Sequence, residues 1–266
     1  GHILYKGQDL TTWDARQMSG FRGKCCSIVF QDPMTSLNPV FTIGNQLREA
    51  IELHTDRKGK ASLARAIEML ELVGINEPQK RVKQYPHELS GGMRQRVMIA
   101  MALACEPDIL IADEPTTALD VTIQAQILEL MQSLQKKMGM AVILVTHDLG
   151  VIADMCDNII VMYGGHICER GTADEIFYNP RHEYTKGLLR SIPNVNNMKE
   201  KLIPIAGTPI NVLNLPKGCA FCARCDEAMK ICLEQQPEEL TINENHKAAC
   251  WMNVRRMLEE EGGGAQ

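Results

Sequence analysis

The chain has 266 residues, of which 45% are hydrophobic and 23% are charged, and its formal net charge is -5 with a pI of about 5.8. This ordinary globular composition supports one well-packed core and a small appendage. The acidic balance speaks against a nucleic-acid partner, because such a protein carries a basic surface. No apolar run is long enough to cross a membrane and the first residues do not resemble a signal peptide, so we expect a protein on the cytoplasmic side.

The first part of the chain is expected to form two strands and a short helix. Residues 1–10 predict a strand and a turn, residues 12–20 a helix, and residues 26–30 a strand that ends at Gln31. Residues 32–39 follow with Pro, Asp, Asn and Ser, which favour turns. Gln31 therefore lies where a strand meets a loop, and the simpler alternative is a polar loop residue without a function.

Residues 43–85 follow a helical and mostly polar pattern, which predicts a group of helices. The apolar face predicted for the first of them consists of Leu47, Ala50, Ile51 and His54. The apolar face predicted for the second consists of Leu63, Ile67, Leu70 and Val73.

The segment from Leu89 to Arg96 (LSGGMRQR) opens a helix that is predicted over residues 93–104. Ser90 is a favourable N-cap residue, because its hydroxyl can accept a hydrogen bond from a free backbone N–H. Gly91 and Gly92 carry no side chain, so that an anion can approach the backbone. The start of this helix is therefore a candidate phosphate site, and the alternative is a capped helix with a glycine-rich entry and no ligand.

A short apolar run between Pro107 and Pro115 ends in two carboxylates, Asp113 and Glu114. A run that is apolar on both faces predicts a strand buried in a parallel sheet. Acidic residues at the carboxyl end of such a strand lie where open α/β sheets bind their ligands. Paired acids suit magnesium-nucleotide chemistry, in which one binds the magnesium shell and the other polarises water.

The chain then passes Asp120 and enters a predicted amphipathic helix over residues 122–138. A predicted strand over residues 141–145 leads to His147, with Asp148 beside it. A histidine just after the carboxyl end of a strand can donate to a γ-phosphate or to a bound water. A structural role for His147 is the alternative.

Five sequence blocks, in this order, resemble the ATPase subunit of ABC transporters over residues 1–190. They are Val29-Phe30-Gln31-Asp32-Pro33, the LSGGMRQR segment, the run from Pro107 to Pro115, Ala118-Leu119-Asp120 and Thr146-His147-Asp148. The resemblance implies an α/β, P-loop NTPase-like core with a helical subdomain at about residues 43–105. The string QDPMTSLNP at residues 31–39 is similar to that of the peptide-importer members.

The resemblance also implies how nucleotide is held. Two such chains would clamp two ATP molecules in a head-to-tail dimer, so that the helix tip of one chain faces the phosphates bound by the other. The residues implied at this contact are Ser90, Gly91, Gly92 and Gln95. Asp120 would communicate across the same interface.

The implied catalytic residues come from the three other blocks. Glu114 would orient or deprotonate the attacking water, and His147 would stabilise the γ-phosphate. Gln31 and Asp113 would hold Mg²⁺ directly or through water. The expected cofactors of the ATPase reaction are therefore ATP and Mg²⁺.

One block of the family pattern is missing. Nothing in the chain fits G-x-x-x-x-G-K-[ST], and the Gly-Lys pairs at Gly23 and Gly59 lack the upstream glycine. In the family this phosphate-binding loop lies before the point where this sequence begins, so the chain looks truncated. We therefore expect it to be inactive or nearly so by itself. The alternative is a non-catalytic, metal-cluster-binding or sensing module on a degenerate ATPase scaffold.

The end of the chain is predicted as a hairpin, a linker and a cysteine-rich extension. Residues 158–163 and 166–169 flank Gly164-Gly165, a two-residue hairpin signal. Residues 191–217 contain four prolines, which exclude a regular helix and make this segment a linker. Residues 218–266 form the extension.

Five of the ten cysteines cluster in this extension, at Cys219, Cys222, Cys225, Cys232 and Cys250. In a reducing cytosol such a cluster favours a metal over disulfides. The C-x2-C-x2-C spacing of the first three is typical of a bacterial ferredoxin. Zinc remains an alternative, as do cysteines without any ligand.

The extension resembles the C-terminal region of oligopeptide and dipeptide importer ATPases, some of which hold an iron–sulfur cluster. By that pattern the ligands of a [4Fe-4S] cluster are Cys219, Cys225, Cys232 and Cys250, with Cys222 as an alternative ligand. The implied partners are two transmembrane permease subunits, a second ATPase subunit that is identical or paralogous, and indirectly an extracytoplasmic peptide-binding protein. The protein would lie peripherally on the cytoplasmic face of the membrane, with peptides as cargo and nickel as the nearest alternative.

Overall fold

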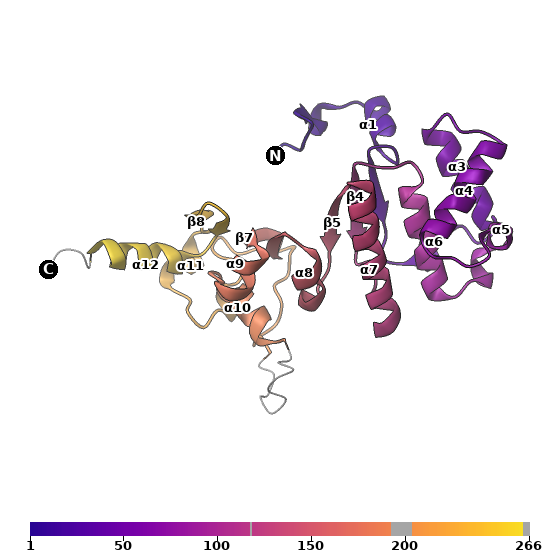
Figure 1. Cartoon of the computed structure of the whole chain (residues 1–266). Helices are drawn as coiled ribbons and strands as arrows, with labels where there is room; N and C mark the ends of the chain where they lie inside the picture. The colour runs from indigo at the N-terminus through magenta and orange to yellow at the C-terminus, as the bar shows by residue number, and fades with distance from the viewer. Residues whose placement is uncertain (118, 193–203, 263–266) are drawn as a thin grey trace. The chain divides into compact units, whose positions relative to one another are not determined.

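The computed structural model describes residues 1–117, 119–192 and 204–262, and it divides into two compact units, residues 1–147 and residues 148–266 (Figure 1). Unit 1 contains, in chain order, β1 (Leu4–Tyr5), β2 (Gln8–Asp9), η1 (Leu10–Thr12), α1 (Ala15–Phe21), β3 (Cys26–Val29), α2 (Pro33–Ser36), α3 (Ile43–His54), α4 (Lys60–Leu72), α5 (Pro78–Arg81), η2 (Pro86–Glu88), α6 (Gly91–Leu103), β4 (Ile109–Asp113), α7 (Val121–Met138) and β5 (Ala141–Val145). Unit 2 contains α8 (Leu149–Met155), β6 (Asn158–Tyr163), β7 (His166–Thr172), α9 (Ala173–Tyr178), α10 (Glu183–Arg190), η3 (Cys222–Arg224), α11 (Lys230–Glu234), β8 (Leu240–Asn243), β9 (His246–Ala248) and α12 (Trp251–Gly262).

The larger sheet of unit 1 is parallel, with β4 between β3 and β5, and β1 and β2 form a separate antiparallel pair. On one face of β4, Leu110 and Ala112 are fully buried, as the apolar run predicts. The other face carries Ile28 and Ile143, which are 41% and 52% exposed, so that this face is buried less than the prediction required. Parallel sheets are normally covered on both faces, and the exposed face is therefore an apolar surface that favours association.

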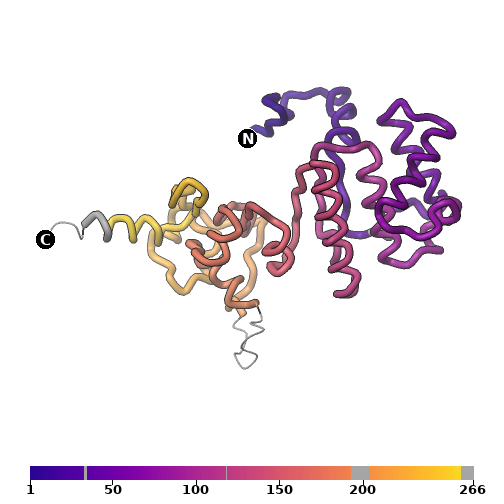
Figure 2. Tube along the Cα trace, viewed as in Figure 1, coloured from indigo at the N-terminus to yellow at the C-terminus, as the bar shows by residue number. Residues whose placement is uncertain are grey.

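The helical subdomain surrounds its own core. Ile43, Leu47 and Ile51 of α3 are completely buried and meet Met69 and Leu70 of α4. Figure 2 shows the trace of residues 43–105 as one group of helices. The α4 face differs from the predicted one, because Leu63 is exposed while Ser62, Arg65 and Met69 are buried.

Two helix starts and one helix end agree with the sequence patterns. Ser90 caps α6 by accepting a hydrogen bond from the N–H of Met93 at 3.4 Å. Asp120 caps α7 by accepting from Ile123 at 3.0 Å, and Gly139 ends α7 in the left-handed conformation.

Unit 2 is built on a four-stranded antiparallel sheet in the order β6-β7-β9-β8. The predicted hairpin is present: Gly164 and Gly165 both have positive φ, and β7 extends to Thr172. The extension adds β8 and β9 to this sheet, with Gly171 of β7 opposite His246 of β9. The predicted domain boundaries at 190 and 217 stay a prediction, and residues 193–203 of the predicted linker lie outside the described residues.

In the described parts of the chain, no helix has both the length and the apolar composition that a membrane span requires.

Candidate nucleotide-hydrolysis site

The polar residues predicted after β3, β4 and β5 meet at one edge of the sheet of unit 1. Because the strands are parallel, their carboxyl ends lie at the same edge. Gln31 follows β3, Glu114 follows β4 and His147 follows β5. The structure therefore brings together three residues that are far apart in the sequence.

Glu114 is the centre of this group. Its Oε2 accepts hydrogen bonds from Gln31 Nε2 at 2.8 Å and from Thr117 Oγ1 at 2.8 Å. Its Oε1 lies 3.1 Å from Nδ1 of His147. Thr117 was not predicted from the sequence; its three-residue spacing from Glu114 within one turn is the signal that could have indicated it.

The backbone at Glu114 is also unusual. Its φ is +42°, a left-handed conformation that non-glycine residues adopt rarely. The N–H of Glu114 donates to the carbonyl of Val145 at 2.8 Å, which ties the turn after β4 to the end of β5. This conformation aims the carboxylate at Gln31 and His147 at a local cost on the order of 1 kcal/mol.

Hydrogen bonding keeps the Glu114 carboxylate charged. The Thr117 hydroxyl and then His147 lower the pKa of Glu114 below its ordinary value. The side chains of Glu114 and His147 are 25% and 73% exposed, so water can reach both. The arrangement provides an ionised carboxylate that can orient a water molecule or accept its proton.

Asp113 and Gln31 have the oxygen ligands that Mg²⁺ prefers. Asp113 is the last residue of β4, next to Glu114. Gln31 donates through its amide nitrogen to Glu114, which leaves its carbonyl oxygen available for a cation. The donor set fits magnesium.

The start of α6 is separate from this carboxylate. Ser90 is bonded to Met93, and the described partners of the Glu114 side chain are Gln31, Thr117 and His147. Gly91 is exposed, with an added Cβ meeting only Leu119 at 3.9 Å. Gly92 has a packing role, because a Cβ there would lie 2.9 Å from Ile123 Cγ2 of α7. The exposed tip is therefore open to a partner chain.

The surroundings of Gln95 and Asp120 indicate roles in holding the helices α6 and α7. Gln95 is 1% exposed, and neither polar atom of its amide has a hydrogen-bond partner among the described residues. The burial argues against direct contact of Gln95 with a nucleotide in this conformation. Asp120 is exposed, and its carboxylate caps α7.

The five cysteines of the extension line one small cavity of about 20 Å³ in unit 2, together with His182 and Glu183. Burial raises the pKa of Cys219 to about 11 and that of Cys225 to about 12. The thiols of Cys219 and Cys225 are therefore neutral at physiological pH. Within residues 1–117, 119–192 and 204–262, no group of three or more His, Cys, Asp or Glu side chains has an arrangement that could hold a metal ion.

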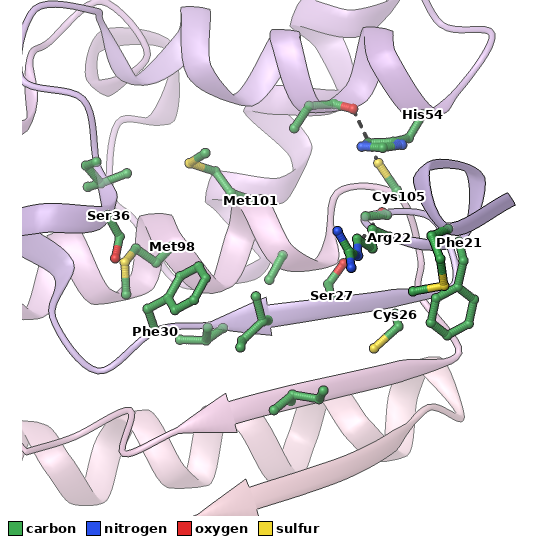
Figure 3. A pocket seen from close by; sticks show the side chains of 18 residues that line it. Phe21, Arg22, Cys26, Ser27, Phe30, Ser36, His54, Met98, Met101 and Cys105 are labelled. Atoms are coloured by element: carbon green, nitrogen blue, oxygen red, sulfur yellow. Dashed lines mark hydrogen bonds between the residues drawn. The ribbon is translucent and has the colours of Figure 1, made fainter. Parts of the chain in front are cut away.

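A larger cavity of about 500 Å³ lies in unit 1 and is distinct from the Glu114 group (Figure 3). Its walls come from α1, β3, α3 and α6, and they are mainly apolar. The labelled side chains around it include Phe21, Cys26, Met98, Met101 and Cys105. None of the residues predicted for nucleotide chemistry lines it.

Comparison with known proteins gives the family. Residues 1–117 match the ABC transporter family, and residues 168–232 match the C-terminal region of oligopeptide/dipeptide transporters. The chain is 52% identical over 256 residues to the dipeptide transport ATP-binding protein DppD of Bacillus subtilis (strain 168), covering 96% of this chain and 76% of that protein. It is 54% identical over 253 residues to the oligopeptide transport ATP-binding protein OppD of the same strain, covering 95% and 71%.

Solved structures agree with the fold. An ATP-binding cassette dimer in a post-hydrolysis state, bound to ADP and Pi, is 28% identical with a TM-score of 0.58, covering 65% of this chain and 73% of that chain. CbiO1 of Clostridium perfringens, part of an ABC transporter complex, is 28% identical with a TM-score of 0.59, covering 67% and 68%. The predicted α/β ABC-ATPase fold is confirmed.

The fold and these relatives define an ABC transporter ATPase, a class that couples ATP hydrolysis to transport. The chain belongs to the family of oligopeptide and dipeptide transport ATP-binding proteins. Membership implies ATP and Mg²⁺ as ligands, membrane permeases as partners, and dimerisation.

Proposed function

We propose that this chain provides the hydrolytic residues of an ATPase that energises the import of oligopeptides or dipeptides. The observation that carries the proposal is the ionised Glu114 carboxylate, held by Gln31, Thr117 and His147 at the carboxyl edge of a parallel sheet. Glu114 orients the attacking water and accepts its proton, and His147 donates to the γ-phosphate of ATP. Gln31 and Asp113 hold Mg²⁺, which neutralises phosphate charge when bound.

The second part of the proposal concerns the dimer. The tip of α6, with Ser90, Gly91 and Gly92, faces the phosphates held by a second ATPase subunit, identical or paralogous. The exposure of Gly91 and the favourable field of a helix N-terminus support this role. Gln95 supports the tip from within the helix, and Asp120 acts beside it at the start of α7.

Family membership supports a third part of the proposal, which concerns the assembly. Two transmembrane permease subunits bind the ATPase pair at the cytoplasmic face of the membrane, and an extracytoplasmic peptide-binding protein delivers the cargo. Relatives that are named for dipeptide and oligopeptide transport favour peptides over nickel as the cargo.

The first test concerns the phosphate-binding loop. Residues 1–266 contain no G-x-x-x-x-G-K-[ST] segment, so we expect magnesium-dependent phosphate release by this chain alone to stay at background. Joining such a segment to the amino terminus should give binding of labelled ATP, whereas the same segment with its lysine changed to alanine should not. Turnover by residues 1–266 alone at the rate of a relative that contains the segment would contradict the proposal.

The extension is proposed to hold a metal cluster. Five thiols line one cavity, which is the donor set of a [4Fe-4S] cluster or of zinc. Metal ligation takes deprotonated thiols and the cavity is small, so binding requires both loss of protons, among them those of Cys219 and Cys225, and widening of the cavity. The proposed ligands are Cys219, Cys225, Cys232 and Cys250.

The metal proposal predicts different effects for different cysteines. Chain purified without oxygen should contain iron and sulfide and absorb visible light, whereas zinc without this absorbance would assign a zinc site. Cys250→Ser should lose most of the metal, while Cys222→Ser, the matched control, should keep it. Metal loss in Cys222→Ser but not in Cys250→Ser would replace the proposed ligand set by the ferredoxin-like one.

A further inference from the structure

Two fully buried ionisable side chains meet in unit 2, where the extension joins the β6–β7 hairpin. Glu169 of β7 and His246 of β9 both have completely inaccessible side chains, and Glu169 Oε1 lies 2.7 Å from His246 Nε2. The same carboxylate accepts backbone N–H bonds from Arg181 at 2.6 Å and His182 at 2.9 Å. Two backbone donors and the His246 ring therefore contact the two oxygens of Glu169.

The other ring nitrogen of His246 also faces a carboxylate. Its Nδ1 lies 3.1 Å from Glu175 Oε2 of α9. Glu175 also accepts hydrogen bonds from Asn179 and Asn243. These two donors lower the pKa of Glu175 most, and His246 lowers it further. An ionised carboxylate only accepts hydrogen bonds, and an imidazolium carries hydrogen on both ring nitrogens, so the position of His246 between two carboxylates suits a charged ring.

The ionisable groups that face this ring come from two elements, Glu169 from β7 and Glu175 from α9. From β8 the amide of Asn243 approaches, and the segment before α10 contributes the backbone N–H groups of Arg181 and His182. Side chains alternate across a sheet, so Arg170 and Lys247 project from its other face.

This ion group is connected to the cysteine cavity on two sides. His182, whose N–H bonds Glu169, has its ring in the wall of that cavity. On the other side β9 ends at Ala248, and the cavity residue Cys250 follows two positions later. A displacement of β9 would therefore move a wall of the cavity.

We propose that His246 is a charged clasp: its imidazolium, held between Glu169 and Glu175, fixes the β8–β9 hairpin on β7 and α9, and loss of its proton opens the cysteine cavity. Removing one partner of a buried ion pair leaves an uncompensated buried charge, which strongly favours local opening. The proton that leaves the ring goes to solvent. The clasp does not depend on the ATPase function or on a bound metal.

The test measures access to the cavity in the full chain, freed of metal. Each cysteine is alkylated with iodoacetamide, and its rate is followed by mass spectrometry, with Cys105 of unit 1 as the internal reference. His246→Gln should raise the rates at Cys222 and Cys250 at least about tenfold. Glu239→Gln is the matched control: it breaks the exposed Arg170–Glu239 pair near the same strands and should leave these rates within about twofold.

A pH series distinguishes a clasp from simple packing. Every alkylation rate rises with pH because the thiols ionise. The rate in His246→Gln is therefore divided by the wild-type rate at each pH, and these ratios are compared. This ratio should fall towards one as the pH rises, because the wild-type ring then loses its proton too. A ratio that stays constant with pH, or unchanged rates in His246→Gln, would overturn the proposal.

A second variant covers the case in which His246→Gln unfolds unit 2 as a whole, which circular dichroism would reveal. Glu175→Gln removes only the partly exposed carboxylate and keeps the buried Glu169–His246 contact. Glu175→Gln should raise the alkylation rate at Cys250 by less than His246→Gln does. The ratio of its rate to the wild-type rate should likewise fall as the pH rises. Equal rates in Glu175→Gln and wild type at every pH would then overturn the proposal.

Discussion

Replacing Glu114 by glutamine is expected to lower kcat for ATP hydrolysis about 10²–10⁴-fold. The expectation applies to a transporter whose ATPase subunit carries this sequence together with a phosphate-binding loop. The amide keeps the size of the side chain but cannot accept the proton of the attacking water. Nucleotide affinity should change little, because the lost interaction acts in the transition state. Phosphate release and binding of labelled ATP measure the two effects separately.

Thr117 supplies the matched control for this experiment. Thr117→Val removes the hydroxyl that donates to Glu114 while the carboxylate remains, so the loss of kcat should be smaller than in Glu114→Gln. Thr117→Ser should restore most of the activity, because serine keeps the donor. A Glu114→Gln enzyme that retains wild-type turnover would show that another group accepts the proton.

Acidification is expected to destabilise unit 2 through His182. Burial lowers the pKa of His182 to about 4, and its Nδ1 accepts the N–H of Tyr184 at the start of α10. The unfolded chain therefore binds this proton more readily than the folded chain. The stability that neutral His182 contributes is fully present above the unfolded pKa of about 6.5. It is lost as the pH falls towards 4, which lowers the free energy of unfolding by about 3 kcal/mol.

Denaturant unfolding at a series of pH values measures this loss. Trp251 reports on unit 2 when Trp13 is replaced by phenylalanine. His182→Asn is the control, because asparagine can still cap α10 but does not titrate. The pH dependence between about 6.5 and 4 should therefore be weaker in this variant by the same amount. An identical pH dependence in both chains would exclude His182 as its source.

Local sequence signals predicted the elements that carry the site. Ser90 ahead of two glycines indicated the start of α6, and the apolar run before Asp113 indicated β4. The grouping of Gln31, Glu114 and His147 was implied by the family resemblance, and its structural basis is that parallel strands end at one edge of a sheet. These features depend on short segments and on one general rule of topology.

Features set by contacts between distant segments were not predictable in this way. The face of α4 was predicted from apolar spacing, yet Arg65 is buried because it bonds the carbonyl of Ala104 and the carboxylate of Glu106. The left-handed conformation of Glu114 was not predictable either, because the residue type at this position does not indicate it. Strands β8 and β9 are short, and they form because β9 pairs with β7 and β8 with β9, so they give little local signal.

The left-handed backbone of Glu114 opposes stability and activity at one position of the site. Glycine adopts this conformation without a penalty, so Glu114→Gly would relieve the turn while it deletes the carboxylate. Selection for thermal tolerance alone would therefore enrich glycine at this position and yield a well-folded protein without turnover. Directed evolution of heat-resistant variants would have to hold position 114 fixed to avoid this outcome.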